Sequence, residues 1–307
     1  MAEVVHADVL KQILIRLHVE DLIRCKRVCK SWHSLITSPR FINRHLNRSY
    51  NKDRYNNELS SRRVRISHRH CSLVGSSNGL VCIISCINSR KVLVGNPLTR
   101  EVRQLRLPGW MTHSPPACSG FGYDSSKDDY KLIVGAEKRK NRTCVQVLSL
   151  KSNVWRVIRE VKYIFCTKIG ILCNGALHWI VRDERMKMLI IAYDLSKEEF
   201  KEIPQPKGEG CLFRFSTSRL GIVKECLCIF GYACEDDVWI MKKYNVKQSW
   251  ELLPRHHEWK RSIIHYLSLP KDESFFHHDV GSWFSGNSSR LQFFIDAPIF
   301  VESLVSP

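Results

Sequence analysis

The sequence predicts an α+β multidomain protein, in which a small N-terminal helical unit is followed by an irregular, all-β propeller. Three observations lead to this fold class. Apolar residues recur at helical spacing up to residue 46, and after residue 71 short β-branched and aromatic runs alternate with Gly, Asn and Asp turns. In that second part a strand-turn-strand pattern returns roughly every 50 residues, the spacing of propeller blades. The 307 residues can hold a large domain and a small appended module.

The helical unit is predicted from two apolar stripes. The first stripe comprises Val9, Leu10, Ile13, Leu14 and Leu17. The second comprises Leu22, Cys25, Cys29, Trp32 and Ile36, at alternating steps of three and four. Asp8 and Asp21 are expected to cap the first two helices, and Phe41 with Leu46 predicts one or two further turns. About forty helical residues bury little core of their own, so this apolar face is expected to complete its burial against a partner.

Charge and composition bound the partners and the compartment. The net charge of +18 favours an acidic partner, whether nucleic acid, an anionic membrane or an acidic protein surface. Residues 1–71 hold half of that excess, and residues 47–71 lack both periods, which predicts a basic linker between a helical domain at 1–46 and a β domain at 72–304. No signal peptide or membrane span is predicted, so we expect an intracellular protein without disulfides among its thirteen cysteines.

The β domain is predicted from two kinds of repeat. Four strand-turn-strand segments align at Asn96, Ser149, Asp194 and Tyr244, and they place Trp155, Phe200 and Trp250 at equivalent positions. Large apolar residues at such positions indicate packing between blades. A second repeat reads SSNGLVCII, LCNGALHWIV and VKECLCIFG, in which an Asn-Gly-type turn leads into a buried strand.

These motifs resemble a known family. Residues 8–36 resemble an F-box, and the β segments resemble, in order, the F-box-associated, kelch-like domain of plant proteins, with SSNGLVCI, VGNPLTREVRQL, GFGYDSSKDDYKLIV and NGALHWIV among the counterparts. The resemblance implies a substrate receptor of a Skp-cullin-F-box ubiquitin ligase. The F-box would dock on a Skp-type adaptor and through it on cullin, and the β domain would hold the target protein. It also implies a non-catalytic chain without cofactor, acting in the cytoplasm, the nucleus or both.

The chain departs from the family pattern at three places. Val5-His6 and Leu17-His18 stand where F-boxes of this family have Leu-Pro, so both prolines are absent. Each loss removes a preset helix entry, which could cost ~0.4 to 1 kcal/mol of order at the docking surface. Near the C-terminus, a further strand-turn-strand unit typical of the family is not recognisable.

The segment RCKRVCKSWHSLI, residues 24–36, admits three interpretations. A zinc site is disfavoured because no second ligand pair stands at structural-zinc spacing, which leaves Cys25 and Cys29 as packed thiols. Nucleic-acid binding is disfavoured because Trp32 falls on the apolar stripe, away from the basic residues. Docking on an acidic adaptor accounts for the stripe and for its basic rim. The residues predicted to make or support that contact are Val5, Val9, Leu10, Ile13, Leu14, Leu17, Leu22, Cys25, Cys29, Trp32 and Ile36.

The remaining alternatives are open. No catalytic motif is recognisable: the GFG at 120–122 lacks the third glycine of a dinucleotide loop, and Asp128-Asp129 and Glu198-Glu199 are expected to be solvated turn charges. The substrate surface is not identifiable, although the loops at 110–116 and 204–215 are candidates. One alternative function is a ligase-independent propeller that binds protein or nucleic acid and carries a degenerate F-box. Within the ligase interpretation, a receptor for pollen self-incompatibility ribonucleases resembles receptors for immune or developmental proteins too closely to be separated from them.

Overall fold

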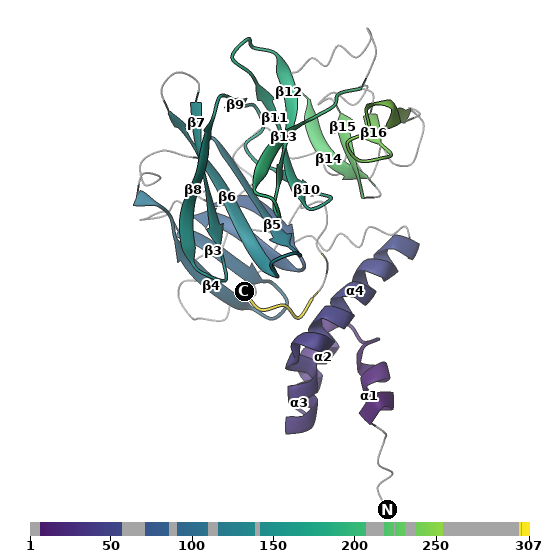
Figure 1. Cartoon of the computed structure of the whole chain (residues 1–307). Coiled ribbons are helices and arrows are strands. Elements are labelled where there is room, and N and C mark those ends of the chain that lie inside the picture. Colours follow the sequence, from purple (N-terminus) through teal and green to yellow (C-terminus); the bar gives the residue numbers. More distant parts are fainter. Residues whose placement is uncertain are drawn as a thin grey trace, which may run out of the picture.

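The computed structural model describes residues 7–56, 71–85, 91–109, 116–138, 142–206, 218–223, 225–230, 238–253, 301 and 303–307. In these parts of the chain four helices precede four antiparallel sheets, each built from consecutive strands (Figure 1). This order confirms the predicted fold class. No helix in the described residues has the length and apolarity needed to cross a bilayer.

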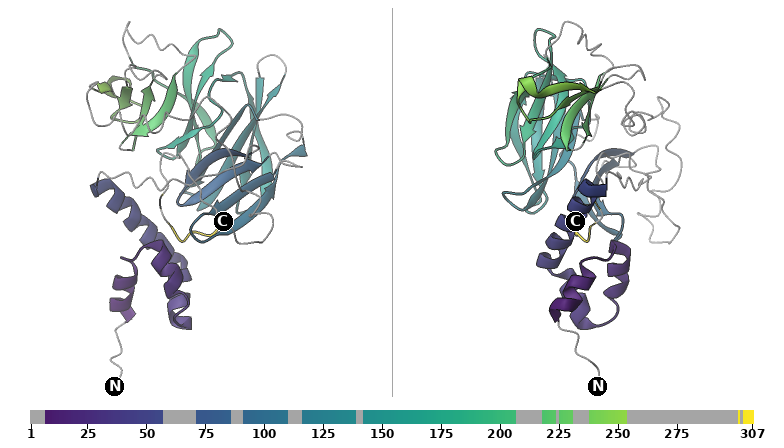
Figure 2. Two further views of the ribbon diagram at one scale, coloured as in Figure 1. Left: turned by 180° about the vertical axis from the view of Figure 1, so that it is seen from behind. Right: turned by 90° about the vertical axis from the view of Figure 1, so that its right-hand side faces the viewer.

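The helices form a small unit at one end of the β domain (Figure 2). Their bounds are α1 (Ala7–Leu14), α2 (Val19–Cys25), α3 (Lys30–Thr37) and α4 (Pro39–Asn56). The prediction of irregular structure after residue 46 is wrong over 47–56, because α4 continues there. A tertiary contact supports this extension, since the Tyr50 hydroxyl donates a hydrogen bond of 2.8 Å to Asn78 Oδ1 in the first sheet. Residues 57–70 of the expected linker lie outside the described residues.

Both predicted capping residues lie inside their helices, since Asp8 and Asp21 stand in the first turns of α1 and α2. The N-cap of α2 is His18, and Asp21 instead lies in the first turn, where its carboxylate accepts a 3.1 Å bond from Arg24. A carboxylate in that turn still interacts favourably with the helix dipole. The N-cap of α3 is Cys29, whose extended backbone breaks the second apolar stripe between Cys25 and Cys29. The stripe is therefore two short helices joined by a turn. The sequence did not predict this break, because no propensity signal at 26–29 marks it.

The first and second sheets are four-stranded meanders, each with one register shift, between Leu73 and Gly75 and between Val145 and Gln146. The first contains β1 (Cys71–Ser77), β2 (Leu80–Ser85), β3 (Lys91–Asn96) and β4 (Glu101–Arg106). The second contains β5 (Cys118–Asp124), β6 (Asp129–Lys138), β7 (Arg142–Ser149) and β8 (Val154–Val161). In both sheets every pair of neighbouring strands is antiparallel.

The third and fourth sheets repeat this plan. The third contains β9 (Ile164–Phe165), β10 (Ile171–Cys173), β11 (Ala176–Arg182), β12 (Met188–Asp194) and β13 (Glu199–Ile203). The fourth contains β14 (Arg219–Val223), β15 (Cys226–Phe230), β16 (Val238–Met241), the 3₁₀ turn η2 (Lys247–Ser249) and β17 (Trp250–Leu253). Strand β5 contacts β1 on one side and β10 and β11 on the other, and β10 and β11 also contact β14. This succession of inner strands is the blade arrangement of a propeller.

The large aromatic residues of the repeats pack between blades, as the sequence predicts. Trp155 lies against the core between the first and second sheets, Phe200 against that between the second and third, and Trp250 against that between the third and fourth. In the strand register Trp155 is opposite Leu148, Phe200 is opposite Tyr193, and Trp250 is opposite Met241. Ser149 and Asp194 directly follow the first two of these partners. The residue equivalent to Ser149 and Asp194 is therefore Lys242, and the alignment at Tyr244 is wrong by two positions. The fourth outer turn is longer than the others, which hid this register in the sequence.

The Asn-Gly repeats form the tight turns that the sequence predicts. Between β1 and β2, Asn78 and Gly79 have φ angles of 51° and 80°. Between β10 and β11, Asn174 and Gly175 have φ angles of 48° and 70°. Two consecutive positive φ angles match the twist of antiparallel strands, and Asn and Gly tolerate them best.

A C-terminal tail, residues 303–307, joins the helices to the first sheet. The Asn96 amide, fully buried, donates two 2.9 Å hydrogen bonds to the carbonyl oxygens of Ser303 and Val305. The Ser303 hydroxyl donates to the carbonyl oxygen of Asn78, and Leu304 lies buried in the core of the helical unit. In Figure 1 this yellow segment runs between the helices and the first sheet. The tail therefore belongs to both cores, although the sequence indicates only the end of the β domain.

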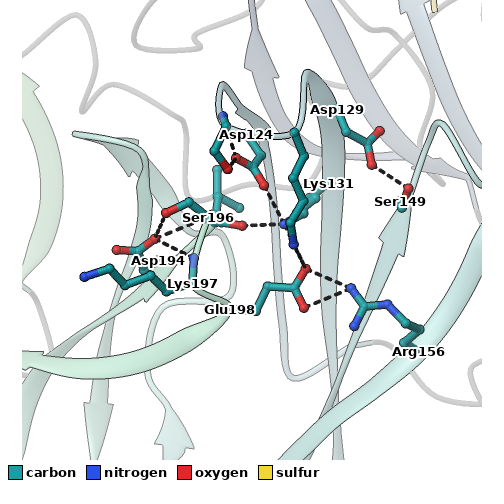
Figure 3. A network of polar contacts seen from close by, with 12 residues as sticks. Asp124, Asp129, Lys131, Ser149, Arg156, Asp194, Ser196, Lys197 and Glu198 are labelled. Carbon is teal, nitrogen blue, oxygen red and sulfur yellow. Dashed lines mark hydrogen bonds and ion pairs between the residues drawn. The ribbon is translucent and has the colours of Figure 1, made fainter.

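A buried ion network connects the second and third sheets (Figure 3). Lys131, only 1% exposed, places its Nζ 2.7 Å from Asp124 Oδ2 and 2.8 Å from Glu198 Oε1, and it donates to the carbonyl oxygen of Leu195. Arg156 holds both Glu198 oxygens at 2.8 and 2.9 Å. Burial acts to raise the pKa of Glu198, but the hydrogen bonds from Arg156 and Lys131 outweigh it and hold the pKa at about 2.

Two of the four turn carboxylates are not the solvated charges that the sequence predicts. Glu198 joins two sheets, and Asp129 is buried, where it accepts hydrogen bonds from the Ser149 hydroxyl and the Lys151 N–H. Asp128 and Glu199 are exposed. The GFG segment has a packing role. A Cβ on Gly122 would lie 2.7 Å from a methyl carbon of Leu195, so a larger residue would force that side chain to shift in the packed junction between the sheets.

Candidate protein-docking site

The helical unit builds its site around one small core. Three predicted contact residues, Leu14, Leu22 and Ile36, are fully buried there together with Phe41 and Val19. Four more predicted residues pack half-buried against them, namely Leu10, Leu17, Cys25 and Trp32. The core therefore brings together seven of the predicted residues. Those that are fully buried can only support a contact, because their side chains have no surface left for a partner.

Apolar side chains that are available to a partner lie on α1 and in the turn after α2. Val9 and Ile13 are each 52% exposed, and their spacing of four residues places them on one face of α1. Val28 is 62% exposed, and the sequence interpretation missed it because it falls on neither stripe. Such exposure in a unit this small is typical of a surface that is completed by another protein.

Trp32 is the largest side chain of the site. It projects from the first turn of α3, is half-buried, and packs on the helical core with its remaining surface accessible. A partly exposed Trp anchored by a rigid helix is the kind of residue that dominates binding energy at protein interfaces. This geometry agrees with the prediction of a packing anchor and leaves part of the side chain accessible.

The two cysteines of the segment lie in different environments. Cys25 is half-buried against the helical core, whereas Cys29 is exposed, so the prediction of two packed thiols is wrong for Cys29. The extended backbone at Cys29 interrupts the helix, so the Cys29 side chain does not continue the apolar stripe. Hydrogen bonds with the Ser31 side chain and with the Trp32 backbone lower the pKa of the Cys29 thiol. No group of three or more potential metal ligands occurs in the described part of the chain.

Exposed basic side chains lie on α2, in the turn after it and at the start of α3. Arg24, Arg27 and Lys30 are exposed, and Arg24 pairs with Asp21 at 3.1 Å. Their charge adds attraction toward an acidic partner and speeds encounter more than it tightens the complex.

Val5 and the position of the first absent proline lie outside the described residues, as do most of the loops at 110–116 and 204–215.

The second missing proline position is well defined. His18 precedes α2 with φ −68° and ψ 155°, and a proline ring fixes φ near the same value. The backbone of this chain therefore already has the conformation that a proline would impose. The absence of the ring leaves the folded geometry in place and costs only the restriction of the unfolded chain.

A short helical unit followed by a β-propeller is the organisation of one class of F-box proteins. The chain belongs to the family described as F-box associated beta propeller domain, whose model matches residues 33–295. The F-box domain model matches residues 7–44. Both matches confirm the resemblance seen in the sequence.

Curated plant proteins share this organisation. The F-box/kelch-repeat protein At3g23880 of Arabidopsis thaliana is 27% identical over 98% of this chain and 95% of its own length. F-box protein At3g07870 and F-box protein CPR1, both of Arabidopsis thaliana, are each 28% identical over 79% of this chain and 70% of their own length. These similarities support, in general terms, that the chain is a substrate adaptor of a ubiquitin ligase and that it binds a Skp-type adaptor. Members of the F-box family are typically non-catalytic adaptors.

Proposed function

We propose that this chain is the substrate-recognition subunit of a Skp-cullin-F-box ubiquitin ligase. Its helical unit docks on the Skp-type adaptor, and its propeller holds a target protein for ubiquitination and degradation. The observation that carries the proposal is the exposed apolar surface of α1, together with the half-buried Trp32 of α3, on a helical unit with one small core. We expect the complex to act in the cytoplasm, the nucleus or both.

The proposed contact has two layers. Val9, Ile13 and Val28 touch the adaptor directly, and Trp32 contributes its accessible edge. The buried residues of the helical core hold these side chains in place without touching the partner. Burying the three exposed aliphatic side chains contributes about 1 to 2 kcal/mol each, because close to half of each side chain is already buried in the free chain.

The test is co-purification of the full chain with a plant Skp-type adaptor. A Val9→Asp, Ile13→Asp variant should lose capture, because each aspartate would be buried without a partner at the interface. The matched control is Val154→Asp, Val157→Asp on the edge strand β8, where the two valines are 52% and 63% exposed. The control adds the same charge at equal exposure, so capture should stay at the wild-type level.

Two further variants sharpen the test. Trp32→Ala should abolish capture, provided that circular dichroism shows an intact helical unit. His18→Pro should stabilise the folded helical unit by ~0.4 to 1 kcal/mol, which strengthens capture by at most about two- to fivefold. If wild type is not captured and the proline variant is, the F-box has decayed and the propeller is a binding module by itself. Unchanged capture by the aspartate variant would refute the proposed contact surface.

A further inference from the structure

The outward face of α4 carries an arginine stripe that the adaptor contact does not use. Arg40, Arg44 and Arg48 follow one another at intervals of four residues, and all three side chains are exposed. Residues four apart lie on one face of a helix, so the guanidinium groups line up over about 12 Å at 1.5 Å per residue. Asn43 and Asn47, also exposed, form a row beside the arginines on the same helix.

Among the residues that the structure describes, no carboxylate neutralises this arginine stripe. Among the described residues, exposed basic side chains such as Lys138 and Lys162 form ion pairs with Glu160 and Glu184, but none of the three arginines does. The first turn of α4 contains no acidic residue either, so Arg40 stands at the positive end of the helix dipole.

This arrangement is locally unfavourable for the helix. Like charges four residues apart repel, and a cation in the first turn opposes the dipole. The tertiary contacts of α4 come from other faces, through the buried Phe41 and through the Tyr50 hydrogen bond to Asn78. Nothing in the described fold compensates for the repulsion, and a local rule broken without compensation points to function.

We propose that the arginine stripe of α4 binds an acidic protein segment, at a site separate from the apolar adaptor contact. Guanidinium groups bind carboxylates through two parallel hydrogen bonds, and all three positions are Arg where Lys would supply the same charge. In an extended segment, alternate side chains lie about 6.6 Å apart on one side, close to the ~6 Å spacing along the helix. The stripe therefore fits a segment with acidic residues at every second position.

A nucleic acid fits this face less well. Proteins that bind single strands stack the bases on exposed aromatic side chains, and each base contributes substantially to affinity. Among the described side chains of α4, Phe41 is buried and the Tyr50 hydroxyl is engaged with Asn78, so neither ring offers a stacking platform. The amides of Asn43 and Asn47 suit polar contacts with a peptide backbone.

The experiment is fluorescence anisotropy with the full chain and three probes. The first probe is a labelled peptide of about eight residues with Glu and Ser in alternation, long enough to cover the stripe. The second has Gln in place of Glu, and the third is a short DNA duplex. The Glu peptide should bind with an affinity that falls with salt, and the Gln peptide should not bind measurably.

The decisive variant is Arg40→Gln, Arg44→Gln, Arg48→Gln. It should weaken binding of the Glu peptide about tenfold or more, because three charge-assisted contacts are lost together. The matched control is Arg159→Gln, Arg185→Gln, Lys197→Gln, which removes the same charge from exposed positions of the β domain. Its binding should stay within about twofold of wild type.

Three outcomes would overturn the inference. Equal loss in both triple variants would mean that net charge alone attracts the peptide. Tighter binding of the DNA duplex, with the same dependence on the three arginines, would make the face a nucleic-acid site. Loss of adaptor capture in the α4 variant would make the stripe part of the adaptor contact. Adaptor capture and peptide binding are measured separately. Failure of the peptide to bind therefore leaves the proposed function standing, and failure of adaptor capture leaves the peptide site standing.

Discussion

Replacing the buried Lys131 by methionine should destabilise the β domain strongly, far more than the loss of an exposed charge. Met fills nearly the same volume, so the substitution removes the charge without opening a cavity. The loss leaves the Asp124 carboxylate 1% exposed and without its cation, although the Ser126 N–H and hydroxyl still donate to its other oxygen. Glu198 keeps Arg156.

The expected cost follows from that arrangement. Removing one partner of a buried ion pair typically costs about 3 to 5 kcal/mol, because the remaining charge stays out of water. For a domain of this size this corresponds to a fall in Tm of roughly 6 to 20 °C. Urea unfolding followed by tryptophan fluorescence measures it, since Trp179 is buried in the same junction and bonds to the Ser119 carbonyl oxygen.

The control is Lys127→Met. Its Nζ lies 3.4 Å from the same Glu198 oxygen, but the side chain is 53% exposed, so the loss should stay below about 1 kcal/mol. A double change, Asp124→Asn with Lys131→Met, should recover part of the stability because no unpaired charge remains. A cost of Lys131→Met no larger than that of Lys127→Met would refute the account of this junction.

Three further predictions concern other parts of the chain. Burial lowers the pKa of His178 to about 4, below its ordinary value near 6.5, so the neutral form contributes stability that is present above pH 6.5 and is lost as the pH falls toward 4; His178→Gln should flatten the dependence of the urea midpoint on pH in that window, and an unchanged slope would contradict this. Gly122→Ala should cost about 1 to 3 kcal/mol through overpacking between sheets, measured by the same unfolding curves, and a neutral result would show that the blades can shift. Leu304→Asp should reduce the hydrogen-exchange protection of α2 and α4, because it places a charge in the helical core, whereas Ser306→Asp, at an exposed position, should not; equal protection in both would exclude a role of the tail in that core.

Local patterns predicted the elements that are determined locally. The Asn-Gly dipeptides at 78–79 and 174–175 identified tight turns because few other residues accept two positive φ angles in succession. The apolar stripes identified the helical core because periodicity reports directly which side chains share a face. For the same reason Trp155 and Phe200 were recognised as packing residues of the blades.

Features that depend on distant residues were not predictable in this way. Nothing near Glu198 in the sequence indicates that Lys131 and Arg156 approach it from another sheet, so a turn carboxylate was expected to be solvated. The length of α4 depends partly on the contact between Tyr50 and Asn78, which no local period encodes. Within the docking site, the sequence named the residues of the apolar face without separating the exposed Ile13 from the buried Leu14, because helical spacing assigns a face and not a depth.

The position of Leu304 in the helical core has a consequence for the order of events during synthesis. Phe41 and Leu304 belong to one core, yet about 260 residues separate them in the chain. At translation rates of about 5 to 20 residues per second, the helices emerge from the ribosome roughly 13 to 50 s before the residue that completes their packing. During that interval the nascent docking unit lacks one of its core side chains while the four sheets assemble. A chain with a fully packed helical unit is thus available only after its propeller has been made.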